Sequence, residues 1–338
     1  MKRHILSIDG GGVRGIVAAV LLDALEGEIR AAGSGRPLCD HFDLIAGTST
    51  GAIIAAGLAA PGGGGDGPRR TPAALRDLYR NRAREIFPLR FWCRLPVIGR
   101  IRQFFGPLYK AASLEHVLAE EIGACEFGGV RRNLFITAYS IDPREPAFFR
   151  GGPAYAARGE AGEHGDIRLI DAIVGSAAAP TFFPPKQISS ASAGMTRTVI
   201  DGGVFINDPA LAAYAEALTL FPGDEIHVVS IGCGRLIQPY PFAEAKGWGF
   251  LEWLSPVGPF RTPLLSAIAD GQTRAVAAQM TTLLGPRYHR FDYDLASGYG
   301  SPDIDNASRR NLRRLEKGAL KMVEELRPRL KAVAAEFA

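Results

Sequence analysis

Short apolar runs alternate along the chain with longer stretches in which apolar residues recur every three or four positions. The short runs are typical of buried strands, and the periodic stretches are typical of amphipathic helices. The runs predict strands at 4–8, 42–46, 133–141, 197–200, 225–232 and 288–293. The periodic stretches predict helices at 15–31, 50–60, 72–86, 113–123, 168–179, 208–221, 263–284 and 307–335. A capping side chain followed by proline marks two helix starts, Thr71-Pro72 and Asp208-Pro209.

The alternation of strands and helices predicts an α/β fold. Its sheet is expected to be parallel or mostly parallel, with helices covering both faces. No repeat divides the chain, and the only low-complexity piece is the glycine-rich loop at 61–68. We therefore expect a single domain over residues 1–338, in which residues 235–338 form a helical C-terminal part.

The segment FDLIAGTSTG at 42–51 combines a predicted strand, the pattern G-x-S-x-G and the start of a predicted helix. This context is typical of a nucleophile elbow, a sharp turn that holds a serine hydroxyl exposed. Gly47 and Gly51 leave room where a side chain would clash, and the following helix directs its positive end at Ser49. Because the chain contains 40 glycines, the pattern alone also fits a chance match. The strand before it and the helix after it favour Ser49 as a nucleophile.

A serine nucleophile needs a general base, because its hydroxyl is weakly nucleophilic at neutral pH. None of the six histidines has a local signature of such a base; they are His4, His41, His116, His164, His227 and His289. A better candidate is Asp201, which follows the apolar run 198–200 and precedes Gly202 and Gly203. A carboxylate at a strand end, followed by glycines, can approach another side chain closely. The alternative interpretation is a turn aspartate without a catalytic role.

Three consecutive glycines, Gly10, Gly11 and Gly12, follow the first predicted strand and precede a helix. Their amides can form an anion cradle, which serves as an oxyanion hole or as a phosphate site. Gly10, Gly12 and Gly15 also satisfy the dinucleotide fingerprint G-x-G-x-x-G. That fingerprint requires an acidic residue at the end of a second strand, whereas the next strand here leads to Ser49. The sequence therefore disfavours a dinucleotide site.

Five segments resemble the motifs of the patatin-like phospholipase family, in the family's order and spacing. They are SIDGGGVRG (Ser7 to Gly15), HFDLIAGTSTGAIIA (His41 to Ala55), SAAAPTFFPP (Ser176 to Pro185), DGGVFINDPA (Asp201 to Ala210) and SIGCG (Ser230 to Gly234). The resemblance to plant-type patatins is close up to about residue 235 and continues weakly beyond it. Ala52 departs from the pattern, because many relatives have a further glycine there, but the residue remains small.

The resemblance implies a three-layer α/β/α fold and the hydrolysis of fatty acyl esters by a Ser-Asp dyad without a catalytic histidine. It assigns Ser49 as the nucleophile, Asp201 as the base and the amides of Gly10, Gly11 and Gly12 as the oxyanion hole. The same motifs include Arg14, Gly15, Gly47, Gly51, Gly202 and Gly203. No metal or organic cofactor is implied, and the expected substrates are the glycerophospholipids of a membrane.

Two further functions stay open. Some bacterial relatives are anti-phage effectors that a cyclic nucleotide activates to degrade the cell membrane, and the arginine- and alanine-rich composition fits a bacterial member. Activation of this kind is compatible with a homo-oligomer. Plant patatins also serve as storage proteins, so a storage or lipid-binding protein with vestigial esterase activity is the alternative.

Composition and charge narrow the class of protein. Hydrophobic residues make up 47% of the chain, and the net charge of +4 disfavours a strong non-specific binder of DNA or RNA. No apolar run approaches the roughly 18 residues that a spanning helix needs, and the N-terminus lacks a signal-peptide core. The four cysteines show no paired spacing, which indicates reduced thiols. We expect a cytoplasmic protein that binds the inner membrane face peripherally when active.

Two basic segments are candidates for contact with that membrane. Residues 86–112 interleave aromatic side chains with cations and contain no acidic residue. They predict a lid or an interfacial segment, with a core-packed insertion as the alternative. The last predicted helix has a basic face formed by Arg310, Arg313, Arg314, Lys317 and Lys321. That face is either simply solvated or a contact for phosphates of lipid headgroups or of a nucleotide.

Overall fold

The computed structural model describes residues 1–64, 67–88, 106–159, 164–235, 239–254, 263–292, 294–295, 299–301 and 303–337. Its strands are β1 (Lys2–Ile8), β2 (Leu44–Thr48), β3 (Leu134–Ser140), β4 (Glu145–Gly151), β5 (Lys186–Ser190), β6 (Met195–Asp201), β7 (Glu225–Ile231) and β8 (Tyr288–Phe291). Its α-helices are α1 (Gly15–Ala31), α2 (Thr50–Ala59), α3 (Pro72–Ile86), α5 (Ala111–Ile122), α6 (Pro153–Ala157), α7 (Leu169–Ser176), α8 (Ala210–Leu220), α9 (Phe242–Ala245), α10 (Phe250–Leu254), α11 (Pro263–Leu284) and α12 (Arg309–Ala334).

Within the described residues the strands form one mixed sheet in the order β5-β6-β3-β2-β1-β7-β8, and β4 also pairs with β3. The run β3-β2-β1-β7-β8 is parallel throughout, as the alternation of strands and helices predicts. The pairs β3–β4 and β5–β6 are antiparallel. Each of these pairs is joined by a short turn, at 141–144 and at 191–194, and a turn of that length permits only antiparallel pairing.

The prediction missed β4 and β5 because their apolar runs are short. Strand β4 reads EPAFFRG, with partly exposed positions between its buried ones, and β5 reads KQISS. Both lie on the antiparallel side of the sheet, where one face of a strand can be solvated and the pattern alternates with period two. A single alternation over so few residues does not distinguish a strand from a polar loop.

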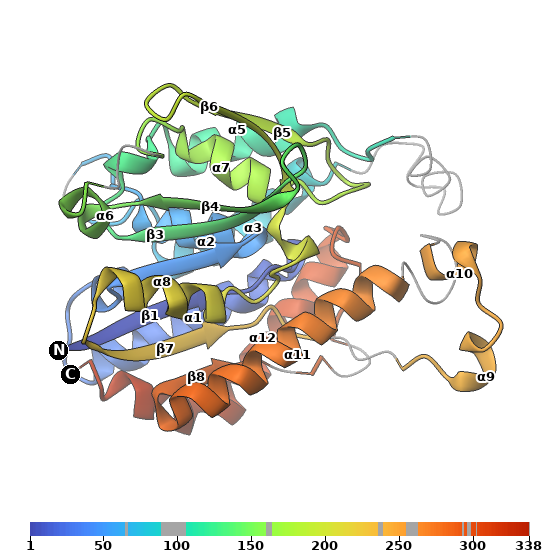
Figure 1. Cartoon of the computed structure of the whole chain (residues 1–338). Helices are drawn as coiled ribbons and strands as arrows, with labels where there is room; N and C mark the ends of the chain where they lie inside the picture. The colour runs from blue at the N-terminus through green and yellow to red at the C-terminus, as the bar shows by residue number, and fades with distance from the viewer. Residues whose placement is uncertain are drawn as a thin grey trace.

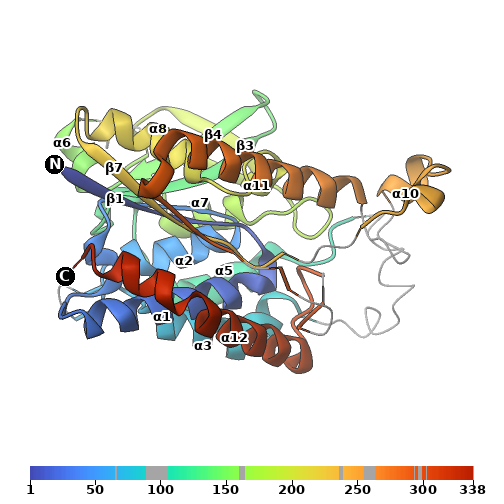
Figure 2. The ribbon, with the colours of Figure 1, turned by 90° about the horizontal axis from the view of Figure 1, so that it is seen from below.

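Helices cover both faces of the sheet in three layers, which is the predicted α/β/α architecture (Figures 1 and 2). Helices α8 and α11 lie on one face. Helices α1, α2, α3 and α12 lie on the other, and α12 packs across the outer side of α1. Strand β8 thus belongs to the same sheet as the strands that precede position 235, and the helices α11 and α12 lie in the layers that cover this sheet.

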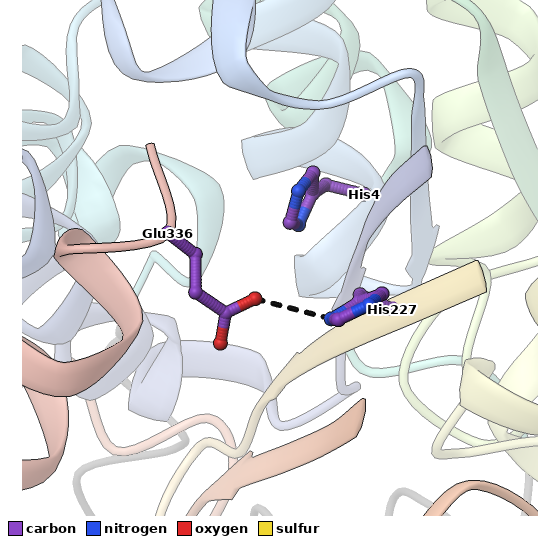
Figure 3. Close-up of side chains that lie close together, drawn as sticks. All are labelled: His4, His227 and Glu336. Carbon is purple, nitrogen blue, oxygen red and sulfur yellow. Dashed lines mark ion pairs between the residues drawn. The ribbon is translucent and has the colours of Figure 1, made fainter. Parts of the chain in front are cut away.

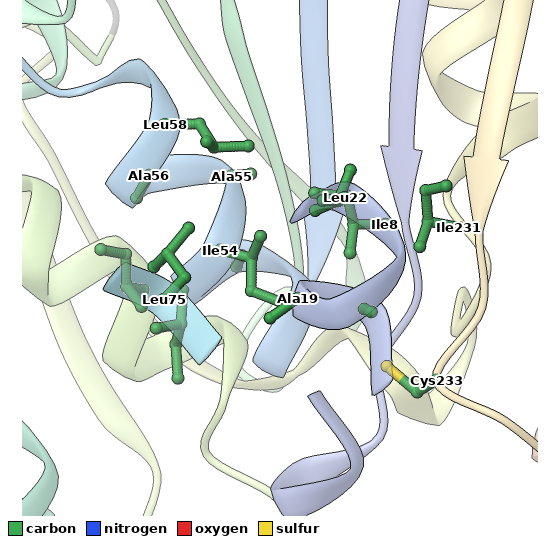
Figure 4. Close-up of a cluster of buried hydrophobic side chains, with 14 of the residues drawn as sticks. Ile8, Ala19, Leu22, Ile54, Ala55, Ala56, Leu58, Leu75, Ile231 and Cys233 are labelled. Atoms are coloured by element: carbon green, nitrogen blue, oxygen red, sulfur yellow. The ribbon is translucent and has the colours of Figure 1, made fainter. Parts of the chain in front are cut away.

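The larger core lies between the sheet and the layer of α1 and α2 (Figure 4). Ile8 from β1, Leu22 from α1 and Ile54 from α2 have no exposed surface there. Every residue of α2 is buried, and its sequence TGAIIAAGLA is accordingly apolar on all sides. The helix that follows the predicted elbow is therefore fixed in place by the core.

The two proline-marked helix starts differ in their details. Helix α3 begins at Pro72 as predicted, and Thr71 Oγ1 accepts a hydrogen bond from the amide of Ala74 at 3.3 Å. Helix α8 begins at Ala210, after Pro209 rather than at it. Asp208 still caps the helix, because its Oδ1 accepts from the amide of Ala210 at 2.9 Å.

The predicted lid or membrane segment at 86–112 falls mostly on residues 89–105, which lie outside the described residues. Two of its aromatic residues are described: Phe87 and Tyr109 pack against each other and against Phe183. These two side chains belong to the core, and the role of the remainder stays a prediction. In the described part of the chain, no helix is both long and apolar enough to cross a membrane.

Candidate active site

Ser49 lies in the sharp turn between β2 and α2, with φ 55° and ψ −118°. A positive φ is unfavourable for a residue with a side chain, so the turn is strained. Gly47 and Gly51 permit this turn, because backbone atoms lie where their side chains would be. A Cβ atom on Gly47 would overlap with the carbonyl of Gly51, and one on Gly51 would overlap with the carbonyl of Ile8. The turn therefore has the geometry of a nucleophile elbow.

The Ser49 hydroxyl donates a hydrogen bond to Oδ2 of Asp201 at 2.7 Å. The other carboxylate oxygen, Oδ1, accepts from the amide of Gly203 at 2.7 Å. Asp201 is only 5% exposed, and this burial raises its pKa to about 6, although the hydrogen bonds from Ser49 and Gly203 oppose the shift. The carboxylate is thus ionised at neutral pH and yet more basic than an exposed aspartate.

The antiparallel part of the sheet brings Asp201 to the serine. Asp201 is the last residue of β6, and it pairs with Ala138 of β3, next to β2. Gly202 fits tightly here, because a Cβ atom on it would overlap with the hydroxyl of Thr137. Thr137 Oγ1 also lies 2.7 Å from Oγ1 of Thr48, the last residue of β2. Strands β2 and β6 therefore end at the site, beside Thr137 and Ala138 in the middle of β3.

Ser176 is a part of the site that the residue pattern did not identify. Its hydroxyl accepts from the backbone amide of Ser49 at 2.9 Å and donates to the carbonyl of Thr137 at 2.7 Å. Ser176 has no exposed surface. It thus fixes the backbone of the elbow to β3. The sequence did include Ser176 in the segment SAAAPTFFPP, which resembles a family motif, but that resemblance assigns no role to Ser176.

The glycine loop passes directly beside Ser49. A Cβ atom on Gly10 would lie 3.4 Å from Cβ of Ser49. The amide of Gly10 donates to the carbonyl of Asn207 at 3.0 Å, so it is already used. This narrows the predicted oxyanion hole to the amides of Gly11 and Gly12, which make no backbone hydrogen bond to any described residue outside their own helical turn. Gly12 has φ +58°, a conformation that favours glycine.

Arg14 and Gly15 support this loop. The Arg14 guanidinium donates to the carbonyl of Gly234 at 3.0 Å and to that of Gly11 at 3.4 Å. Gly15 begins α1 where it crosses α2, and a Cβ atom on it would lie 2.5 Å from Oγ1 of Thr50. The two motif residues therefore position the loop and have no visible chemical role of their own.

A buried ionic cluster holds Asp9, the residue that precedes the glycine loop. Arg290 of β8 donates to Asp9, the residue before the loop, at 2.7 and 2.5 Å, and to Asp208 at 3.1 Å. It also contacts Asp292 at 2.9 Å and the hydroxyl of Ser230 at 2.7 Å. Burial raises the pKa of Asp9 and of Asp208, and the neighbouring carboxylates add to the shift, whereas Arg290 opposes it. The sequence did not predict this cluster, since its members are far apart along the chain.

The histidines do not take part in the site. Within the described residues, neither Ser49 nor Asp201 makes a hydrogen bond or an ion pair with a histidine. His4 and His227 are partners in register near the amino ends of β1 and β7, at the opposite end of the sheet from Ser49. His116 lies on α5 with a side chain that is 69% exposed. The structure therefore brings Ser49 together with Asp201 alone among the candidate bases.

Comparison with known proteins finds similarity over most of the chain. A family model described as Patatin-like phospholipase matches residues 6–214. Patatin-like protein 2 of Oryza sativa subsp. indica is 30% identical over 340 residues, which cover 93% of this chain and 82% of that protein. Patatin-like protein 1 of Arabidopsis thaliana is 30% identical over 348 residues, covering 94% and 81%. Among solved structures, human GIVD cytosolic phospholipase A2 has a TM-score of 0.48 at 10% identity, covering 99% of this chain and 60% of that one.

The ionic cluster predicts a pH-dependent loss of stability. Replacing Arg290 by Met leaves Asp9 and Asp208 buried without a cation, which should lower the free energy of unfolding by about 3–5 kcal/mol at pH 8. The folded variant then binds more protons than the unfolded chain, so its deficit should shrink as the pH falls to 5. Urea unfolding at the two pH values measures this.

The matched control is Arg235→Met. Arg235 contacts the same Asp292 at 3.3 Å, but its side chain is 31% exposed. Its loss should lower the free energy of unfolding by no more than about 1 kcal/mol. Equal deficits for the Arg290 variant at pH 5 and pH 8 would argue against a buried, proton-linked cluster.

Proposed function

Because the chain belongs to the patatin-like phospholipase family, we propose that it is a serine acylhydrolase that cleaves fatty acyl esters of membrane glycerophospholipids. The observation that carries this proposal is the 2.7 Å hydrogen bond from Ser49 Oγ to the buried carboxylate of Asp201. A serine on a strained elbow, in direct contact with a basic carboxylate, is an activated nucleophile. The glycine loop beside it supplies donors for the charge that develops during acyl transfer.

The reaction proceeds through an acyl-enzyme. Asp201 accepts the proton of the Ser49 hydroxyl as the serine oxygen attacks the ester carbonyl carbon. The amides of Gly11 and Gly12, with the positive end of α2, stabilise the oxyanion of the tetrahedral intermediate. The intermediate collapses, the lysolipid alkoxide leaves with the proton from Asp201, and the fatty acyl group remains on Ser49. Water, deprotonated by Asp201, then attacks the acyl-enzyme, and the fatty acid is released as the Ser49 oxygen leaves with the proton from Asp201.

The geometry supports an aspartate as the base without a histidine. In a Ser-His-Asp triad the imidazole accepts the proton because its pKa is close to neutral. Here burial raises the pKa of Asp201 to about 6, so the carboxylate itself is a comparably strong base. Gly203 holds one carboxylate oxygen, and the other remains directed at the Ser49 hydroxyl.

The basic face of α12 supports a bilayer as the partner of this enzyme. Leu312, Leu315 and Met322 are buried, which leaves the opposite face of the helix to solvent. Five exposed cations on α12 make no ion pair within the described residues: Arg309, Arg310, Arg313, Arg314 and Lys317. The cations are near the start of the helix, and the segment before it contacts the glycine loop, because Val13 donates to the carbonyl of Ile304 at 2.7 Å.

These cations therefore lie at the end of the molecule that contains Ser49, where the parallel strands have their carboxyl ends (Figure 2). Anionic headgroups attract exposed lysine and arginine by about 1 kcal/mol for each cation near the surface. We propose that this face of α12 orients the site toward an anionic bilayer, and that the binding weakens with salt.

The dyad is tested with glycerophospholipid vesicles and the variants Ser49→Ala and Asp201→Asn. Each should reduce fatty acid release to background, and the double variant should be no worse than either single one, because the two residues act as a unit. Single His→Gln variants at the six histidines should retain activity. Mass spectrometry of the released lipids, with melting temperatures as a control for folding, measures this. Full release by the Ser49→Ala variant would contradict the dyad, whereas no release by the folded wild type would instead favour a lipid-binding or storage protein.

The basic face is tested by a triple variant, Arg310→Gln, Arg314→Gln and Lys317→Gln. Removal of three cations should weaken binding to anionic vesicles roughly hundredfold, with unchanged turnover of a soluble short-chain ester. The matched control replaces Lys2, Arg287 and Lys331, which are cations at the start of β1, just before β8 and near the end of α12, and it should bind as the wild type does. Equal loss in both variants would contradict an oriented membrane contact. Calorimetry with cyclic di- and trinucleotides completes the test. If the wild type and the control bind a nucleotide and the Arg310/Arg314/Lys317 variant does not, this face is a nucleotide site.

A further inference from the structure

Three histidines and one glutamate gather at the end of the sheet opposite to Ser49. His4 of β1 and His227 of β7 are direct partners in the parallel register. Because side chains alternate along a strand, both rings point to the same face of the sheet. Glu336, just beyond α12, approaches the two rings from that face (Figure 3). His289 of β8 lies 3.0 Å from the same carboxylate.

The distances in this cluster are close to those of a metal site. One donor atom each from His4, His227 and Glu336 lie within 4.8 Å of one another. In a tetrahedral zinc site with bonds of about 2.1 Å, the donor atoms are about 3.4 Å apart. His227 Nδ1 and Glu336 Oε2 are already 3.1 Å apart. Small side-chain rotations would therefore complete the set.

The hydrogen bonds around His227 leave one ring nitrogen unexplained. Its Nε2 lies 2.7 Å from Oε1 of Glu225, and an ionised carboxylate can only accept, so Nε2 carries the proton. Nδ1 of a neutral ring is then an acceptor that faces the Glu336 carboxylate, which is also an acceptor. Nδ1 is buried and makes no hydrogen bond of good geometry, and Nε2 of His289 is likewise directed at the Glu336 carboxylate. A buried polar atom calls for a partner, and a metal ion between the rings and the carboxylate would supply one.

We propose that His4, His227 and Glu336 bind a divalent transition-metal ion of the zinc type, with His289 or water as the fourth ligand. Two imidazoles and a carboxylate are a donor set that suits zinc, whereas calcium and magnesium prefer oxygen ligands alone. The contact of Glu225 with the other nitrogen of His227 is the carboxylate–histidine arrangement that orients a metal-binding imidazole. The ion links the end of α12 to β1 and β7, far from the dyad, and its role is structural.

Phe337 makes the site testable without loss of the fold. Its ring packs against His4, His41 and Phe42 at centroid distances of 4.7, 5.2 and 5.3 Å. This apolar contact holds the segment after α12 in place whether or not an ion is bound. Replacing Glu336 should therefore remove a ligand while the segment stays docked.

The experiment titrates chelator-treated full-length protein with ZnCl2 in a calorimeter. We expect one saturable site, with affinity at least about 100-fold lower in His227→Gln and in Glu336→Gln, and about 10–100-fold lower in Glu225→Gln. The matched control is His116→Gln, which breaks another His–Glu pair, with Glu120 at 3.6 Å on the exposed face of α5, and should leave zinc affinity unchanged. Magnesium should not compete.

Two further measurements separate a specific site from surface binding. Zinc at a hundredfold excess over its Kd should raise the melting temperature of the wild type by about 4 °C, and of the double variant His227→Gln/Glu336→Gln not at all. Cobalt(II) should give the visible absorption of a tetrahedral complex in the wild type alone. Equal zinc affinity of the wild type and the double variant, or an equal rise in melting temperature, would overturn the proposal.

Discussion

The strained turn at Ser49 is the constraint on which the rest of the site depends. A residue with a side chain at φ 55° costs on the order of 1–3 kcal/mol, and the surrounding structure must compensate for it. Here the buried helix α2 fixes one side of the turn, and the hydrogen bond from the Ser49 amide to Ser176 fixes the other. Because Gly47 and Gly51 have no side chains, β1 and β2 can approach the turn closely and help to hold it. The result is a hydroxyl held at one position in front of Asp201.

The glycine loop is held by a second, electrostatic constraint. Arg290 draws Asp9, Asp208 and Asp292 together, and these residues follow β1, precede α8 and follow β8. Asp9 and the Gly10 amide, which donates to Asn207, then leave the loop little freedom. A buried network of this kind contributes little net stability, but removing its central cation, Arg290, is costly. It thus serves to fix the loop relative to the elbow, two elements that are distant in sequence.

Much of this arrangement could be predicted from the sequence, because the parallel strands and their helices have strong local patterns. The run LIAG before Ser49 and the apolar helix after it indicate the elbow directly, and Asp201 was identifiable by its place at a strand end. The edge strands β4 and β5 could not be predicted, since few of their positions are buried. Arg290 and Ser176 were missed for a different reason. Ser176 acts through partners more than 30 residues away, and so does Arg290 with the exception of Asp292, so only the folded chain brings them together.

The central claim is that Asp201 is the base that activates Ser49. The most direct test is the pH dependence of kcat/KM with a soluble short-chain ester, because this parameter reports the pKa of the free enzyme. As the pH falls, protonation of Asp201 removes the base, so activity should decline along a single limb with a pKa of about 6. The limb should be the same in all six His→Gln variants. A limb that moves or disappears when one histidine is replaced would contradict the account and assign the proton transfer to that histidine.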